Sequence, residues 1–316
     1  MRLLAALGAA LALAASAAAS LPHVKLPRDH YAHSAAGVEW WYVTSDVRGS
    51  DGHRYSVFVT LFRRGGLALP VSQIVNLDTG ALVGSSEIIV PLRVGATNLD
   101  VRTAVATLHY DARANTWSFG ASGLRYGVTL KVTPEKPYAV HGGGTGLVGV
   151  GNLQSDYYSA TRARVEGTFT ATGRSVGFRG TAWFDHQWVE RVAVLSLPKW
   201  DWFGCQFDDG TELMAYKILA GASRAAGKGG TFVRRDGSAA AVTDPRLVAG
   251  NRAFSGAGRR WPLDWTIQVP SQHLAVTAKA LVPDQLVQGF LHPTFWEGVA
   301  TVTGTKTGIC FVEETS

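Results

Sequence analysis

The sequence has little that would build long helices. No segment long enough to cross between two parallel strands has apolar residues at the three- and four-residue spacing of an amphipathic helix. We therefore do not expect a parallel sheet with helical crossovers. Instead, short runs rich in β-branched and aromatic residues follow one another, separated by turn signals of Gly, Pro and Asp. This spacing predicts an all-β chain of antiparallel strands, and the expected strands include 99–108, 156–165, 167–171 and 192–197.

Charged residues are also sparse. Asp, Glu, Lys and Arg make up 17% of the 316 residues, and the formal net charge is +6 at pH 7. The basic residues form no cluster of the kind that binds a phosphate backbone, so we expect no nucleic-acid partner. The glycine triplet at 142–144 lacks the Lys-Ser/Thr of a phosphate-binding loop. No Gly-x-Ser-x-Gly is present, which argues against an α/β-type esterase.

Cysteine is nearly absent, since the chain holds only Cys205 and Cys310. Neither lies near the N-terminus, where Arg2, an apolar run over 3–15 and small residues over 16–20 predict a signal peptide covering residues 1–19. The apolar run is shorter than the roughly 20 residues that span a bilayer. We expect a secreted or periplasmic protein. In that compartment the two cysteines could pair, or they could be two buried thiols.

Aromatic residues gather in one stretch, residues 180–202, which reads GTAWFDHQWVERVAVLSLPKWDW. Indole walls remove water from ionisable groups and so shift their pKa values, which is one way to make a catalytic acid or base. The same groups could instead only tie strands together. The stretch contains four of the ten tryptophans and three ionisable candidates for a site: Trp183, Trp188, Trp200 and Trp202, with Asp185, His186 and Asp201.

Adjacent side chains of a strand point to opposite faces. Asp185 and His186 should therefore point apart unless a bulge intervenes, one lining a cavity and the other serving the structure. Asp185 or Asp201 could act as an acid held neutral by apolar surroundings, and His186 could position a water molecule. Arg162 is expected in a buried ion pair, with Asp185 as one possible partner, because a lone buried charge is costly.

Two blocks of the chain, 40–62 and 200–219, repeat one order of features. Each has an aromatic strand, an acidic-glycine turn and an apolar return strand. We predict two barrel-like domains, 20–190 and 191–316, with a seam near residue 190. In the first block both faces of the return strand are apolar, as in a barrel wall that packs on its two sides. The Gly- and Pro-rich segment 134–151 is predicted to be a loop.

Histidines are concentrated before the first predicted strand, at His23, His30 and His33. No Cys, Asp or Glu occurs near them at the spacing of a known metal site. We therefore expect no metal and no cofactor.

Six motifs occur in the order in which a known family carries them: EWWY at 39–42, YYSATR at 157–162, GTAWFDHQW at 180–188, WDWF at 200–203, DDGTELMAY at 208–216 and FWEGVATVTG at 295–304. On these motifs the chain resembles the AttH/CrtC family over almost its whole length. The resemblance implies two tandem lipocalin-like antiparallel barrels. It also implies a hydrophobic ligand, because the family includes carotenoid 1,2-hydratases, and an association with export systems, because it includes secreted proteins described as hydrolases.

The resemblance assigns roles to particular residues. His186 and Trp188 match a His-x-Trp pair of the hydratases, and Tyr216 matches a tyrosine that precedes their acid. Ile218 stands where those enzymes have the carboxylate, so Asp185 or Asp201 would have to replace it. For binding the substrate we expect aromatic and basic side chains, namely Trp183, Trp188, Trp202, Trp41, Tyr158 and Arg162.

Three functions are compatible with these observations. The first is acid-initiated hydration or cyclisation of an apolar isoprenoid, polyene or lipid-like substrate. The second is a carrier for such a ligand without chemistry, since tandem barrels are good containers. The third is a secreted hydrolase.

Overall fold

The structure, a computed structural model, describes residues 23–95, 99–150, 153–189, 199–220, 224–290 and 292–315. The expected signal peptide, the seam near residue 190 and an expected strand at 192–197 lie outside these residues. Within them the chain is built of strands, with three single-turn 3-10 helices at Arg28–His30, Gly142–Gly144 and Pro270–Gln272. No helix in the described part of the chain has the length and apolar character needed to cross a membrane.

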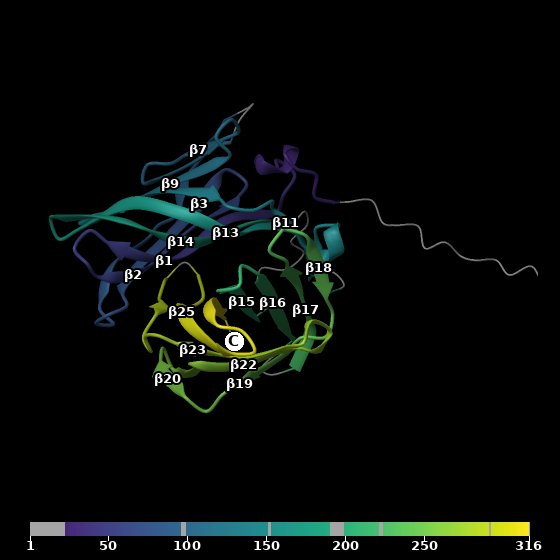
Figure 1. Cartoon of the computed structure of the whole chain (residues 1–316). Coiled ribbons are helices and arrows are strands. Elements are labelled where there is room, and N and C mark those ends of the chain that lie inside the picture. Colours follow the sequence, from purple (N-terminus) through teal and green to yellow (C-terminus); the bar gives the residue numbers. More distant parts are fainter. Residues whose placement is uncertain are drawn as a thin grey trace, which may run out of the picture.

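Fourteen strands of the described residues form the first sheet: β1 (Val38–Gly49), β2 (Arg54–Arg64), β3 (Leu67–Asn76), β4 (Leu82–Glu87), β5 (Val90–Pro91), β6 (Arg93–Val94), β7 (Asp100–Arg102), β8 (Ala106–Asp111), β9 (Thr116–Gly123), β10 (Tyr126–Pro134), β11 (Ala139–Val140), β12 (Leu147–Val150), β13 (Leu153–Ala171) and β14 (Arg174–Val189). Their main order is β4-β3-β2-β1-β14-β13-β10-β9-β8-β7-β6, and all pairs are antiparallel. The sheet curls until β4 contacts β9 (Figure 1).

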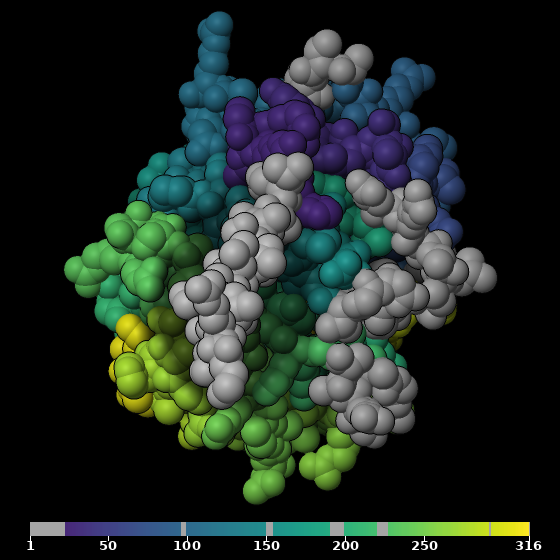
Figure 2. Space-filling view, turned by 90° about the vertical axis from the view of Figure 1, so that its right-hand side faces the viewer, coloured from purple at the N-terminus to yellow at the C-terminus, as the bar shows by residue number. Residues whose placement is uncertain are grey.

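The second sheet curls in the same way below the first (Figure 1). Its order is β18-β17-β16-β15-β26-β25-β23-β22-β19, and β24 pairs with β25. In the space-filling view the N-terminal residues, purple to teal, lie above the C-terminal residues, green to yellow (Figure 2). The strands are β15 (Lys199–Phe207), β16 (Glu212–Ala220), β17 (Arg224–Val233), β18 (Ala239–Val242), β19 (Arg246–Ala249), β22 (Asp264–Val269), β23 (Leu274–Ala280), β24 (Leu286–Val287), β25 (Phe295–Gly304) and β26 (Gly308–Glu314), with a separate hairpin of β20 (Ala253–Gly256) and β21 (Arg259–Pro262).

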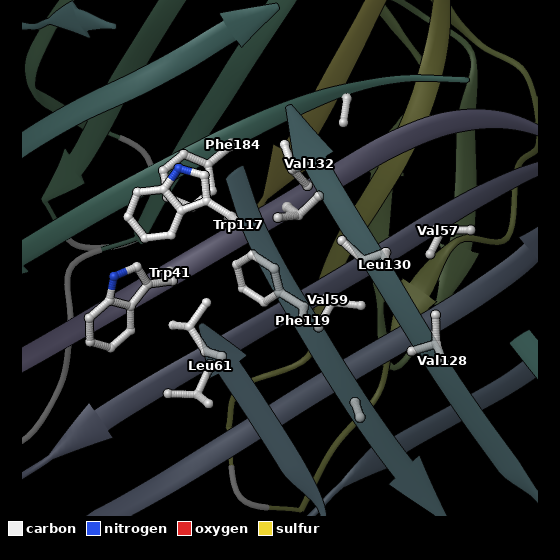
Figure 3. Packing of buried hydrophobic residues seen from close by; sticks show 14 of the residues in the cluster. Trp41, Val57, Val59, Leu61, Trp117, Phe119, Val128, Leu130, Val132 and Phe184 are labelled. Carbon is white, nitrogen blue, oxygen red and sulfur yellow. The ribbon is translucent and has the colours of Figure 1, made fainter. Parts of the chain in front are cut away.

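The prediction of an all-β fold with two curled antiparallel sheets is confirmed. Each curl encloses its own hydrophobic core. In β2 the alternate residues Tyr55, Val57, Val59 and Leu61 belong to the first core, while Phe58 points to the opposite face. Figure 3 shows this core, with indole and phenyl rings packed against the aliphatic side chains of neighbouring strands.

A third apolar cluster, which we call the intersheet layer, lies between the outer faces of the two sheets. Gly204 lets the layer close, because a Cβ there would come within 3.0 Å of both Trp183 and Trp202. The central strands are apolar on both faces because one face packs in this layer. Its buried members are Tyr42, Phe58, Val71, Val148, Tyr157 and Trp183 from the first sheet and Trp202, Met214, Val287, Phe295, Val299 and Phe311 from the second.

Four predicted elements were wrong in detail. The segment 134–151 is not only loop, because it contains β11, β12 and a 3-10 turn. An expected strand at 99–108 is divided into β7 and β8 by a turn in which Thr103 bonds the backbone of Ala106. Two expected strands at 156–165 and 167–171 form the single strand β13. Gly167 continues the ladder at a point where a residue with a Cβ would collide with the backbone of Thr129.

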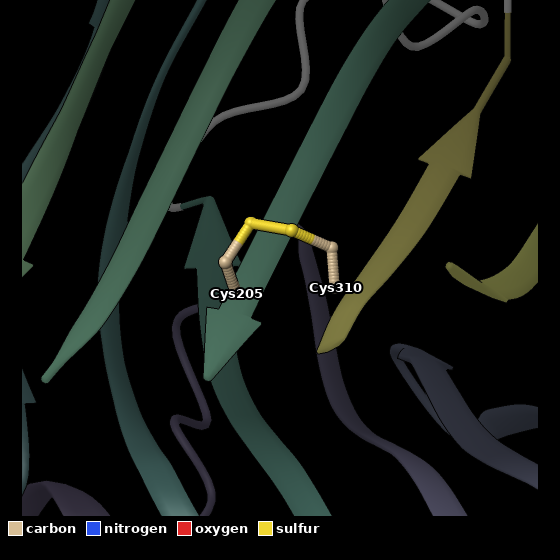
Figure 4. The surroundings of a disulfide bond; sticks show 2 residues. All are labelled: Cys205 and Cys310. Carbon is tan, nitrogen blue, oxygen red and sulfur yellow. A yellow bond between two sulfur atoms is a disulfide. The ribbon is translucent and has the colours of Figure 1, made fainter. Parts of the chain in front are cut away.

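Cys205 and Cys310 form a disulfide (Figure 4). They lie directly opposite one another on β15 and β26, with both side chains in the second core. Of the two alternatives that the sequence left open, pairing is therefore the one found.

We predict that the double variant Cys205→Ala/Cys310→Ala unfolds at lower denaturant. The disulfide joins residues separated by 105 positions, and closing so long a loop restricts the unfolded chain. The expected loss in the free energy of unfolding is about 2–5 kcal/mol. Urea unfolding of the two proteins, with reduced wild type as a third sample, measures it; equal midpoints for wild type and variant would contradict the prediction.

Candidate functional site

The predicted site residues are divided among three environments, rather than gathered in one cavity. Strand alternation makes this division. The intersheet layer receives Asp185, Trp183, Trp202 and Tyr216; the first core receives His186, Trp41, Trp188 and Tyr158; and the second sheet's interior receives Asp201.

Asp185 faces the intersheet layer from the middle of β14. Its Oδ1 accepts hydrogen bonds from the Ser159 hydroxyl at 2.5 Å and from the Trp183 indole at 2.7 Å. Ser159 and Tyr42 flank Asp185 on the neighbouring strands β13 and β1. Burial raises the pKa of Asp185 to about 7, and the hydrogen bonds from Ser159 and Trp183 oppose only part of that rise. The group can therefore give or take a proton near neutral pH.

Glu297, on β25, brings a second carboxyl to the same layer. Its Oε1 accepts hydrogen bonds from the Tyr42 hydroxyl and the Thr44 hydroxyl, both at 2.8 Å, so it joins the two sheets. Its Oε2 is buried and has no hydrogen-bond partner among the described residues. Burial, and then the charge of Glu313, raise the pKa of Glu297 well above its usual range. This raised pKa favours the protonated form of Glu297, and Oε2 is the oxygen left to carry the proton.

Glu313 lies directly across from Glu297 on β26 and is partly exposed. The carboxyl itself is surrounded by protein, and this burial raises the pKa of Glu313 to about 7, against a hydrogen bond from Trp200 that lowers it. Aromatic residues at the rim of the intersheet layer, Trp40, Trp200 and Tyr216, are partly buried as well. The three carboxyls of Asp185, Glu297 and Glu313 thus extend from the buried centre of the layer to its solvent edge.

A chain of polar groups leads away from Asp185 on the other side. Ser159 Oγ, which donates to Asp185, is 2.7 Å from His141 Nε2, and His141 Nδ1 is 2.8 Å from Thr231 Oγ1 on the second sheet. Burial lowers the pKa of His141 to about 3, so its imidazole is neutral. Ser159 therefore takes a hydrogen bond from His141 while it donates to the carboxylate of Asp185.

We predict a pH dependence of stability that Asp185→Asn removes. A carboxyl whose pKa rises from 3.8 unfolded to about 7 folded stabilises the fold below about pH 4, and this contribution is lost as the pH rises through 7. The difference in unfolding free energy, wild type minus variant, should fall by up to roughly 4 kcal/mol between about pH 4 and about pH 8. Denaturant unfolding across this range measures it. Asp236→Asn, at an exposed turn, is the control and should show no such fall; a flat difference for Asp185→Asn would refute the assigned shift.

His186 points into the first core, so the predicted divergence of Asp185 and His186 is confirmed. Its Nδ1 is 3.0 Å from the Tyr158 hydroxyl, and its Nε2 is 2.9 Å from Glu39 Oε1. Its ring stacks on Trp41, with 4.8 Å between ring centroids, and lies 5.0 Å from Trp188. The His-x-Trp pair is thus on the face of β14 away from Asp185.

Asp201 and Tyr216 lie on opposite faces of the second sheet. Asp201 Oδ2 forms an ion pair with Lys217 Nζ at 2.8 Å, and its neighbour across β26 is Glu314. Burial raises the pKa of Glu314 to about 8. Tyr216 packs at the edge of the intersheet layer, opposite Trp202 on β15. Asp201 is therefore away from the layer that Asp185 and Glu297 face.

Asp185, the possible partner named for Arg162, is not its partner. Arg162 Nε is 2.6 Å from Glu212 Oε1, and Lys136 Nζ is 2.8 Å from Glu212 Oε2. A β-bulge in β13 between Ala160 and Ala163 turns Arg162 towards the second sheet. Arg162 thus links the two sheets at Glu212, and it does not contact the three carboxyls of Asp185, Glu297 and Glu313.

Sequence reasoning missed Glu297, Glu313, Ser159 and His141. Glu297 lies inside the motif FWEGVATVTG, so the motif itself was the available signal. Ser159 lies inside YYSATR, but nothing in the sequence shows that it lies across from Asp185, which is 26 positions later in the chain. A surface hollow of about 540 Å³ at the far end of the first sheet is lined by Arg125 and Tyr126, and by none of the predicted site residues.

Comparisons with known proteins agree with this architecture. A candidate AttH from Nitrosomonas europaea has a crystal structure that matches with a TM-score of 0.82 and 22% identity, over 92% of this chain and 96% of that one. Kievitone hydratase from Nectria haematococca matches with a TM-score of 0.76 and 17% identity, over 94% of each chain. No curated protein sequence matches significantly. The AttH-like family model matches residues 90–316, and the chain therefore belongs to the AttH-like family.

Proposed function

We propose that this protein is an exported enzyme that adds water to a carbon–carbon double bond of an apolar isoprenoid, polyene or lipid-like substrate. One observation carries the proposal: the buried carboxyl of Glu297, whose pKa is raised by burial and whose Oε2 is unpartnered among the described residues, faces an aromatic layer. Adding water to an unactivated alkene starts with a proton from such an acid. That kievitone hydratase shares the fold is in keeping with this reaction class.

The chemistry divides between the two carboxyls. Glu297 Oε2 gives its proton to one alkene carbon, and the positive charge that forms on the other carbon is stabilised by the faces of Trp183, Trp202 and Tyr42. Water attacks this cation, and ionised Asp185 takes the released proton. Proton transfer from Asp185 back to Glu297 restores the starting state. The net change is one molecule of water added to the alkene.

Substrate would enter at the rim formed by Trp40, Trp200, Tyr216 and Glu313, because these side chains are partly exposed while the centre of the layer is buried. An apolar chain could replace the contacts that the two sheets make with each other there. Cyclisation of a polyene would use the same acid, with a second double bond attacking the cation in place of water.

The hydrolase alternative has less support. In a serine hydrolase the histidine lies between the serine and the carboxylate. Here Ser159 lies between His141 and Asp185, and the second nitrogen of His141 contacts Thr231. The Ser159 proton is held by the carboxylate and is not drawn by the imidazole.

Incubation of the purified mature protein with isoprenoid and lipid extracts, followed by mass spectrometry, tests the proposal. A gain in mass of one water that depends on the protein supports a hydratase, and an isomer of unchanged mass supports cyclisation. Ligand that co-purifies unchanged favours the carrier function instead. If the experiment finds no bound ligand and no product, the proposal loses its support.

A further inference from the structure

His33, Glu39 and His186 come together at the mouth of the first core. His33 Nδ1 is 2.8 Å from Glu39 Oε1, and His186 Nε2 is 2.9 Å from the same oxygen. The three ligand atoms all lie within 4.8 Å of one another. They come from the segment 23–37 before β1, which we call the lead-in, from β1 and from β14. No local spacing in the sequence could therefore indicate them.

Two of the three side chains, His186 and Glu39, are held in place by a second polar contact. Tyr158 Oη, 3.0 Å from His186 Nδ1, is also 2.8 Å from His30 Nδ1. Arg63 Nη1 is 2.6 Å from Glu39 Oε2, which leaves Oε1 to face the histidines. Outer partners of this kind orient the ligands of metal sites.

The rings themselves are also fixed. His33 stacks on Trp188 with 3.8 Å between centroids, and His186 stacks on Trp41. The side chain of His33 is 22% exposed, so an ion has a way in from solvent.

We propose that His33 Nδ1, His186 Nε2 and Glu39 Oε1 bind one divalent transition-metal ion of the zinc type. Two imidazoles and one carboxylate are the ligands that zinc takes at sites with an open fourth position, whereas Ca²⁺ and Mg²⁺ take mainly oxygen. Arg63 balances the charge of Glu39 through the other oxygen. Each histidine nitrogen needs to move away from Glu39 Oε1 only by tenths of an ångström, from hydrogen-bond contact at 2.8 or 2.9 Å to the spacing of ligand atoms around an ion.

The site is independent of the proposed hydration. It lies on the face of β14 opposite Asp185, within the first sheet, and shares no residue with the intersheet layer. A bound ion would fasten the lead-in, through His33, to β1 and β14. Its consequence is therefore a tighter N-terminal segment, which can be measured without any substrate.

The test uses the mature protein after treatment with a chelator. Isothermal titration with Zn²⁺ should give one site, and Co²⁺ should give visible absorption bands of low-coordinate cobalt with nitrogen ligands. His33→Ala should weaken binding by at least about 100-fold, and Tyr158→Phe by about 10-fold. His53→Ala, a histidine paired with Asp78 on the exposed surface, is the matched control and should bind like wild type. Zn²⁺ should also raise the unfolding temperature and slow protease cleavage in the lead-in of wild type.

Several results would overturn the site. These are the absence of saturable binding at one equivalent, equal affinity for wild type and His33→Ala, or an equal loss in His53→Ala. If His33→Ala folds poorly, His33→Gln keeps a hydrogen bond to Glu39 and repeats the comparison. Loss of hydratase activity alone, with zinc binding intact, would count against the proposed function and leave the metal site standing.

Discussion

Glu297→Gln is expected to reduce the rate of water addition by at least about 100-fold while the protein stays folded. The amide oxygen of glutamine can still accept the hydrogen bonds of Tyr42 and Thr44, so the joint between the sheets remains. What disappears is the proton on Oε2. The change isolates the acid from its structural role, because size and hydrogen bonding are nearly conserved.

The measurement is product formation by mass spectrometry with the substrate class found in the extract experiment. Glu166→Gln, at an exposed glutamate of β13 that pairs with exposed Lys131, serves as the matched control and should keep full activity. If Glu297→Gln retains the wild-type rate, Glu297 is not the acid. Asp185→Asn then becomes the decisive variant, since Asp185 is the second fully buried carboxyl that faces the layer and its pKa is raised as well.

Glu212→Ala should cause the largest loss of stability of any single change considered for this chain. Glu212 is fully buried, and its two oxygens bind Arg162, on β13 of the first sheet, and Lys136. Removal leaves two cations facing each other without their anion. Breaking one partner of a buried ion pair costs about 3–5 kcal/mol, and we expect a value in this range.

Urea unfolding measures this loss, with Glu166→Ala as the control. Glu166 also pairs with a lysine, Lys131, but both side chains are exposed, and such pairs contribute little. If the unfolding midpoint of Glu212→Ala shifts as little as that of Glu166→Ala, the contact between the sheets does not depend on the ion pairs of Glu212.

Strand periodicity was enough to predict much of the fold. The alternation through Tyr55, Val57, Val59 and Leu61 predicted a two-faced wall, and the structure places one face in the first core and the other in the intersheet layer. Alternation also predicted that Asp185 and His186 diverge. Both rest on a local rule, that neighbouring side chains of a strand alternate, and needed no knowledge of distant contacts.

The partners of the site residues could not be predicted in the same way. Glu297 meets Tyr42 and Thr44 across more than 250 positions, and only the stacking of the two sheets brings them together. Arg162 pairs with Glu212 and not with Asp185, the partner that the sequence suggested, because a bulge redirects it, and a bulge leaves no clear mark in one sequence. The His33, Glu39 and His186 cluster depends in the same way on the path of the lead-in.

The account depends most on the proton carried by Glu297 between the sheets. Carbon-13 labelling of glutamate carboxyls, with infrared spectra of wild type and Glu297→Gln compared at neutral pH, reads this proton directly. We predict that the wild-type spectrum contains a protonated carboxyl band that is missing from the variant. A difference spectrum that shows only the loss of an ionised carboxylate would contradict the central claim.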